Sequence, residues 1–309
     1  MINLRYHVVS LVGVFLALAI GIAVGASVIN QGLVQQQQDR LATIERNLDA
    51  KNSTIGSLRR QVNAGEAYQE QAEAPLLAGH LAGSQVVFVV ADGVPRAVLA
   101  ELAARVEQAG ASMIGEVWLT ERAGVRNGSE QRAVDTALGI STGSPATARY
   151  LLLQSLRAAL RKSSPSTVMV ALDAAGIVEL RNQRMSGSPI PPDTRIVVVS
   201  GDGAKPSVDT VMSPLVTLLA ADDPNRVVVA EIPPTADADG GATSLQPDAL
   251  VARVRGVKEL TGRVSTVDDV RVASGRVATV LALEDLDTGL VGHYGSGPGA
   301  SSLVPVVDR

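Results

Sequence analysis

Side chains that could bind a metal or transfer a proton are few in this sequence, and they stand far apart. The chain has no Cys, and after position 7 the only histidines are His80 and His293. Sites for soft metal ions usually need clustered Met, His or Cys, yet the five Met residues are dispersed, at positions 1, 113, 169, 185 and 212. The lack of Cys excludes disulfides, zinc–thiolate sites and thiol nucleophiles. No catalytic constellation is visible, so we expect a protein that is not an enzyme.

Acidic pairs and two loops offer further candidate chemistry. The pairs beginning at Asp222 and Asp268 could serve metal binding or acid–base catalysis, but both lie near predicted element ends, where acidic residues are ordinary. "DADGG", from Asp237, resembles the start of a calcium loop without its third ligand or terminal Glu, so a solvated turn is preferred. "SGDGAKPS", from Ser200 to Ser207, follows a predicted strand and precedes a helix, where an anion could bind. Its glycine spacing matches no phosphate motif, so a plain loop is favoured.

A glycine-rich segment, "GLVGHYGSGPGASSLVP", runs from Gly289 to Pro305. Within it the candidate binding loop consists of Gly292, His293, Tyr294, Gly295 and Gly297. Glycine permits two interpretations, a loop that crosses close to another backbone or a loop that binds a ligand. The sequence does not separate them.

An apolar segment near the amino terminus is long enough to cross a membrane. Residues 8–29 carry no charge, and as a helix they would be roughly 33 Å long. This exceeds the apolar part of a cleaved signal peptide, so an uncleaved anchor is favoured over cleavage. Arg5 precedes the segment and no charge follows until Asp39. We therefore expect residues 1–7 in the cytoplasm and everything after residue 29 outside it.

Small residues form a stripe on this apolar helix, at Gly13, Ala17, Gly21 and Gly25. Residues four apart share one helix face, and small side chains let two helices approach closely in lipid. The stripe predicts helix pairing. The alternative is that Gly and Ala are simply common in membrane helices.

Residues 30–72 form a polar, Gln-rich segment with a heptad repeat. The a and d positions are Val34, Leu41, Ile44, Leu48, Ile55, Leu58 and Val62. Lys51 interrupts the d row and Gly65 ends it. The strict spacing of seven favours a coiled-coil stalk over a solitary amphipathic helix lying on the globular domain. Together with the small-residue stripe it predicts a parallel homodimer.

Residues 81–309 alternate strand-length apolar runs with helical patterns. The runs begin at Gln85, Ala111, Thr167, Arg195, Arg226 and Arg263. Most are continuous and Val-rich, as in a parallel sheet buried on both faces. We expect a doubly wound, mostly parallel, Rossmann-like α/β domain, but neither a dinucleotide fingerprint nor a P-loop occurs. A net charge of −4 and 2% aromatic residues argue against nucleic-acid binding.

Several segments resemble one family over essentially the full chain. They are the opening "MINLRYHVVSLVGVFLALAIGIAVG", the Gln-rich segment, "STVDD" and the closing "GHYGSGPGASSLVP". Together they resemble the actinobacterial copper transporter MctB family, also known as SteB. The resemblance implies a role in copper homeostasis that limits copper accumulation, with copper as the ion, and a pore in the outer membrane. It also implies a role in cell separation, with a membrane partner, SteA, and control of a peptidoglycan hydrolase through the coiled coil.

The residues give less support to direct copper transport than to a structural role. Dispersed Met and His do not form an evident copper site, and one apolar helix per chain cannot enclose a water-filled pore. An envelope protein in copper transport or homeostasis is therefore expected from the resemblance. The alternative is an anchored scaffold that acts on cell separation and affects copper indirectly, through the envelope.

Overall fold

A computed structural model describes residues 4–161, 167–181, 190–191, 193–222, 226–234 and 246–306, without the side chains of residues 4, 26–34 and 222. The acidic loop at Asp237, the side chain of Val34 and the acidic pair at Asp222 therefore lie outside the description. The chain divides into two units, Met1–Ala67 and Tyr68–Arg309, each of which is described by itself.

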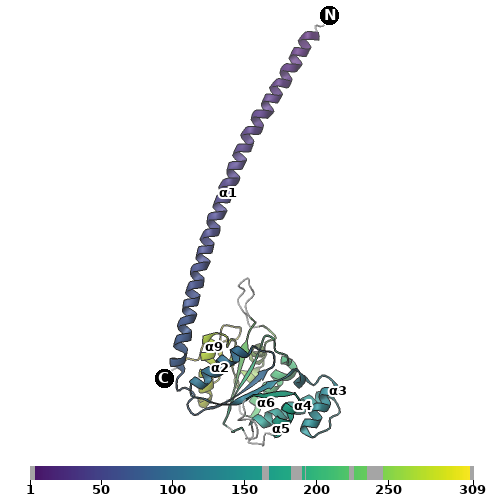
Figure 1. The fold of residues 1–309 in the computed structure, drawn as a ribbon, viewed down its shortest axis with the longest axis vertical. Coiled ribbons are helices and arrows are strands. Elements are labelled where there is room, and N and C mark those ends of the chain that lie inside the picture. Colours follow the sequence, from purple (N-terminus) through teal and green to yellow (C-terminus); the bar gives the residue numbers. More distant parts are fainter. Residues whose placement is uncertain are drawn as a thin grey trace. The chain divides into compact units, whose positions relative to one another are not determined.

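The first unit is formed by the helix α1 (Leu4–Leu77), which ends within the second unit (Figure 1). Its segment Arg5–Gly25 is long and apolar enough to cross a membrane, and none of it is buried. This confirms the predicted amino-terminal apolar helix. The described heptad positions, from Leu41 to Val62, are 47% to 59% exposed. Within this unit the apolar face of the heptads is thus uncovered.

One sheet organises the second unit. Its described strands are β1 (Gln85–Ala91), β2 (Ser112–Leu119), β3 (Val178–Arg181), β4 (Arg195–Gly201), β5 (Val227–Ile232), β6 (Ser265–Val267) and β7 (His293–Tyr294). They lie in the order β3-β2-β1-β4-β5-β6-β7 and pair in parallel, except that β3 runs antiparallel to β2. The predicted doubly wound, mostly parallel sheet is confirmed.

Helices cover the sheet (Figure 1). The described ones are α2 (Arg96–Gln108), α3 (Gly128–Leu138), α4 (Pro145–Arg161), α5 (Thr167–Ala174), α6 (Ser213–Asp222), α7 (Leu250–Gly256), α8 (Lys258–Thr261) and α9 (Ala273–Asp285). Short turns of helix are η1 (Glu121–Gly124), η3 (Val208–Met212) and η5 (Leu286–Thr288). One group of contacts joins α2 to α9, and another joins α4 to α3, α5 and α6.

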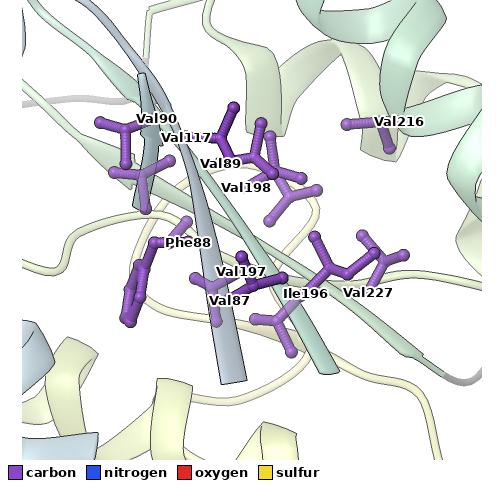
Figure 2. Packing of buried hydrophobic residues seen from close by; sticks show 14 of the residues in the cluster. Val87, Phe88, Val89, Val90, Val117, Ile196, Val197, Val198, Val216 and Val227 are labelled. Atoms are coloured by element: carbon purple, nitrogen blue, oxygen red, sulfur yellow. The ribbon is translucent and has the colours of Figure 1, made fainter. Parts of the chain in front are cut away.

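The core consists of valine-rich strands between these helices. From Val86 to Ala91 every residue of β1 is fully buried, and every residue of β5 is buried. Figure 2 shows their valines packed with those of β2 and β4. Helix α2 follows its predicted pattern, with Leu99, Leu102 and Val106 buried. Both faces of the central strands are therefore shielded from water, which explains why apolar and polar residues do not alternate in their sequences.

Two expectations about strands were wrong. The run at Thr167 is not a strand but helix α5, which buries Met169 and Leu172 and leaves Val170 46% exposed. A short apolar run fits a buried helix as well as a strand, and only the packing against α3 and α4 decides. The strands β3 and β7 were not expected, because one is a mixed-polarity edge strand and the other has two residues.

Candidate functional site

The predicted binding loop begins as a strand. His293 and Tyr294 form β7, paired with Thr266 and Val267 of β6. A Cβ on Gly295, whose φ is +123°, would lie 1.7 Å from Asp268 Oδ1. A Cβ on Gly292 would lie 2.1 Å from the Tyr294 hydroxyl. Both glycines thus allow close packing against side chains, and the choice between a close-packed loop and a binding loop stays open.

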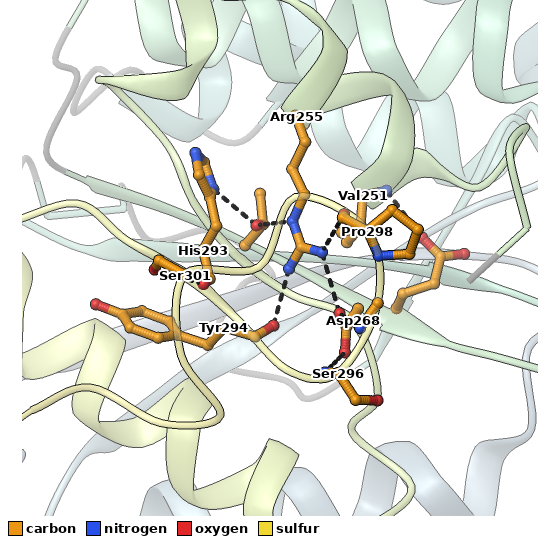
Figure 3. Close-up of polar contacts among 11 residues, drawn as sticks. Val251, Arg255, Asp268, His293, Tyr294, Ser296, Pro298 and Ser301 are labelled. Atoms are coloured by element: carbon orange, nitrogen blue, oxygen red, sulfur yellow. Dashed lines mark hydrogen bonds and ion pairs between the residues drawn. The ribbon is translucent and has the colours of Figure 1, made fainter. Parts of the chain in front are cut away.

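A buried ion pair holds the turn after β7 (Figure 3). Asp268 accepts the backbone N–H groups of Ser296 and Gly297 at 3.2 and 2.7 Å and pairs with Arg255 Nη1 at 3.0 Å. Both charged side chains are at most 5% exposed. This also gives one member of the acidic pair at Asp268 a partner within the protein, rather than a metal.

Arg255 completes this arrangement from α7. Its guanidinium donates to Thr266 Oγ1 and to the carbonyl oxygen of Tyr294, each at 2.8 Å, and to the carbonyl oxygen of Pro298 at 3.0 Å. Burial lowers the pKa of Arg255, and the hydrogen bond and charge of Asp268 oppose that shift. We call Arg255, Asp268, Thr266 and the turn that they hold the loop cluster. Its polar groups bind one another.

The histidines His80 and His293 have different polar neighbours. His293 Nδ1 lies 2.9 Å from Thr266 Oγ1, and burial, followed by the Arg255 charge, lowers the pKa of its imidazole. His80 Nδ1 lies 2.6 Å from Glu284 Oε2. In the described part of the chain, no group of three or more His, Asp or Glu side chains could hold a metal ion.

A cavity of about 420 Å³ lies at the carboxyl ends of β4 and β5. The end of β4 and the loop that follows it, residues 200–207, form one wall of it. Lys205 donates to Asp92 through its ammonium at 2.8 Å and its backbone N–H at 2.7 Å. Because Asp92 follows β1, these bonds tie together the loops on either side of the point where the strand order reverses.

Two polar side chains lie together in this cavity. Ser200 and Glu231 are partners in the parallel register of β4 and β5, so they project from the same face of the sheet. Glu231 is 4% exposed and accepts the N–H of Val251 at 3.1 Å. Burial raises its pKa to about 7, against the opposing hydrogen bonds from Val251 and Leu250. The Ser200 hydroxyl is buried, with no hydrogen-bond partner among the described residues.

Sequence reasoning selected the loop after β4 but missed this pair. The available signal was an acidic residue inside the otherwise apolar run "RVVVAEI". The neighbouring carboxylates of Asp202, Asp209 and Asp248 make the cavity acidic. An anion, which the loop position had suggested, is therefore disfavoured there.

The small-residue stripe faces open space in the first unit. A Cβ built on Gly13, Gly21 or Gly25 would meet no atom within 4 Å, and Ala17 is exposed. A second helix could therefore approach this face.

Comparison with known proteins identifies the family. The family model described as "Copper transport outer membrane protein, MctB" matches residues 1–305. This chain belongs to the MctB family. The relatives named "Copper transporter MctB" include one from Mycobacterium tuberculosis (strain ATCC 25618 / H37Rv), 27% identical over 98% of this chain and 99% of the relative. Another, from Mycobacterium leprae (strain TN), is 26% identical over the same shares of the two chains.

Membership of the MctB family confirms the resemblance seen in the sequence, and the family is not named as one of enzymes. With its amino-terminal apolar helix, the chain is a membrane or envelope protein. Two of the segments that carry the resemblance, "STVDD" and "GHYGSGPG", meet in the loop cluster, through Thr266, Asp268 and the turn after β7.

Proposed function

We propose that this protein takes part in copper transport in the cell envelope, as a membrane-anchored member of its family. The match of the family model to residues 1–305 carries this proposal, together with relatives of nearly equal length that are named copper transporters. The apolar helix anchors the chain, and Arg5 before it favours a cytoplasmic amino terminus with the bulk outside the cytoplasmic membrane.

The membrane-spanning capacity of one chain limits how it could transport copper. The described part of the chain contains one helix able to cross a membrane, and a single helix cannot enclose water. Met113, Met169 and Met212 are buried in the core. We therefore propose that copper is not carried through one chain by its own ligands, but through an assembly of chains or through an effect on the envelope.

Copper content of cells tests this proposal. Cells that lack the protein should accumulate copper, measured by mass spectrometry, while their zinc content stays unchanged. Full-length protein should restore the copper level, and so should a variant with His80→Gln and His293→Gln, because neither histidine serves as a ligand. Unchanged copper in cells without the protein would contradict the proposal, and failure of a folded double variant would instead indicate direct copper binding.

An anchored scaffold for cell separation is the second candidate, and the uncovered heptad face supports it. In a parallel, in-register pair of stalks, Arg40 at a g position would lie opposite Glu45 of a second copy at an e position. This complementary pairing favours a homodimer. Through this stalk the protein would engage a SteA-like membrane partner and a peptidoglycan hydrolase.

Two charges placed in the seam test the homodimer. Leu48→Glu with Ile55→Glu should convert a dimer of the full-length protein in detergent to a monomer, because like charges would meet at successive a positions. Multi-angle light scattering measures the mass. Ala50→Glu with Ser57→Glu adds the same charge on the outer face and should leave the dimer intact. A dimer that survives the first substitution must form elsewhere, and a monomeric wild type would assign the heptads to another protein's helix.

A further inference from the structure

The cavity at the ends of β4 and β5 has the position of a ligand site. In open α/β sheets ligands bind outside the carboxyl ends of strands, near the point where the strand order reverses. Here the reversal lies between β1 and β4, and the cavity adjoins it on the β4 side. Its volume of about 420 Å³ suits a small molecule.

The cavity lining contains a buried polar group for which the described residues provide no hydrogen-bond partner. Ser200 is fully buried, and its Oγ finds no partner in the described part of the chain. Buried hydroxyls are normally hydrogen-bonded, because leaving one unpaired costs free energy. Glu231 stands beside it on the same face of the sheet. A hydroxyl and a carboxylate are thus presented together to whatever fills the cavity.

The negative charge of the cavity lining favours a positively charged ligand. Asp202 and Asp248 have no ion-pair partner among the described residues, while Asp209 pairs with the exposed Arg253. The cation of this loop, Lys205, is bound to Asp92. The carboxylates do not converge as a metal cage within the described residues. An organic cation, which can span separate carboxylates, fits better than a metal ion.

We propose that this cavity binds a small aminoalcohol, whose ammonium group pairs with Glu231 and whose hydroxyl hydrogen-bonds to Ser200. Asp202 and Asp248 supply the surrounding negative charge. This site is separate from the loop cluster and goes beyond copper transport, because no step of that role requires it.

Proton linkage supports the same assignment. Glu231 must be ionised to pair with an ammonium group, and its pKa is raised to about 7 by burial, with the charge of Asp248 acting in the same direction. The other charged groups of the lining are Asp202, Asp209 and Lys205. The affinity for the amine should therefore rise roughly tenfold from pH 6 to pH 8, as Glu231 ionises.

Ligand-observed NMR on the full-length protein in detergent tests the site. The probes are ethanolamine, serinol and 3-amino-1-propanol, with glycerol and ethylene glycol as uncharged counterparts. We expect saturable binding of the three amines, mutual competition among them, and none for the uncharged molecules. Glu231→Gln and Ser200→Val should each weaken binding at least tenfold at pH 8, whereas Glu107→Gln, outside the cavity, should not.

Two further measurements make the result decisive. Fluorescence of Trp118, the single tryptophan, shows whether each variant is folded, and Ser200→Ala replaces Ser200→Val should the latter unfold. Glu231→Gln should also abolish the pH dependence between 6 and 8. Failure of all three amines to bind would overturn the proposal, and so would binding that both cavity variants leave unchanged.

Discussion

The two ends of helix α7 meet polar clusters that use similar groups in opposite ways. Near its carboxyl end Arg255 joins the loop cluster, where the carboxylate of Asp268 and the hydroxyl of Thr266 both have partners. At its amino end the N–H of Val251 donates to Glu231, which lies beside the Ser200 hydroxyl, a group without a hydrogen-bond partner in the described part of the chain. A satisfied cluster stabilises the fold, whereas an unsatisfied one leaves bonding capacity for a ligand.

The glycine-rich loop and the cavity also differ in how visible they are in the sequence. The loop attracts attention through its glycines, yet Gly295 is needed because Asp268 occupies the space of a side chain. The cavity depends on a serine and a glutamate from strands separated in sequence. Four substitutions, two in each cluster, test this contrast.

The largest effect is expected from Arg255→Met. It leaves the Asp268 charge buried without its cation and removes three further hydrogen bonds, so the free energy of unfolding should fall by about 3–5 kcal/mol. Urea unfolding of the full-length protein, followed by Trp118 fluorescence, measures it. Arg253→Met is the matched control on the same helix, since that arginine is 48% exposed and should contribute less than about 1 kcal/mol. Equal effects would show that the loop cluster does not stabilise the fold.

The second effect depends on pH. The folded-state pKa of Glu231 is about 7, above its ordinary value of 4.5, so the folded protein holds a proton that the unfolded chain releases. Wild-type stability should therefore fall as pH rises from 4.5 to 7 and be level above that range, as far as this group contributes. Glu231→Gln should match the wild type near pH 4, below the ordinary value of 4.5, and exceed it at pH 8 by at most about 3 kcal/mol.

Unfolding curves at several pH values, without added amine, check this expectation. Glu107→Gln, an exposed carboxylate, should follow the wild-type curve. A Glu231→Gln variant that is less stable than wild type at pH 8 would indicate that the ionised carboxylate is needed to cap α7, rather than tolerated at a cost.

The smallest expected change in stability comes from removing one of two buried hydroxyls, that of Thr266 or that of Ser200. Thr266→Val removes the acceptor of the Arg255 Nε–H bond and should cost about 1–3 kcal/mol. Ser200→Ala removes a hydroxyl that makes no hydrogen bond among the described residues, so stability should change by less than about 1 kcal/mol. Thermal unfolding of the two variants side by side gives the difference. A large loss for Ser200→Ala would mean that Ser200 serves the fold and not a ligand.

A third buried cluster shows another limit of sequence reasoning. Glu73, near the end of α1, is fully buried and pairs with Arg276 Nε at 3.0 Å and with Arg105 Nε at 3.1 Å. Nothing in the polar sequence around Glu73 distinguishes it from the exposed residues of α1. The arginines come from α9 and α2, so only their convergence makes this glutamate a buried one.

The sequence by itself determined the local and periodic features. An uncharged apolar stretch predicts the amino-terminal helix, and continuous valine runs predict buried parallel strands, because both signals depend on neighbouring residues alone. The segments at the two chain ends also sufficed for the family. The register of seven in the stalk and the small-residue stripe predict helix pairing in the same way and stay predictions.

Only the tertiary structure decided which polar residues are satisfied. It made the run at Thr167 a helix through packing against α3 and α4, and it gave Asp268 a partner in Arg255. It also placed Ser200 beside Glu231, although 31 positions separate them in the sequence. Hydrogen bonding and burial depend on contacts between distant segments, and no periodicity within one segment records them.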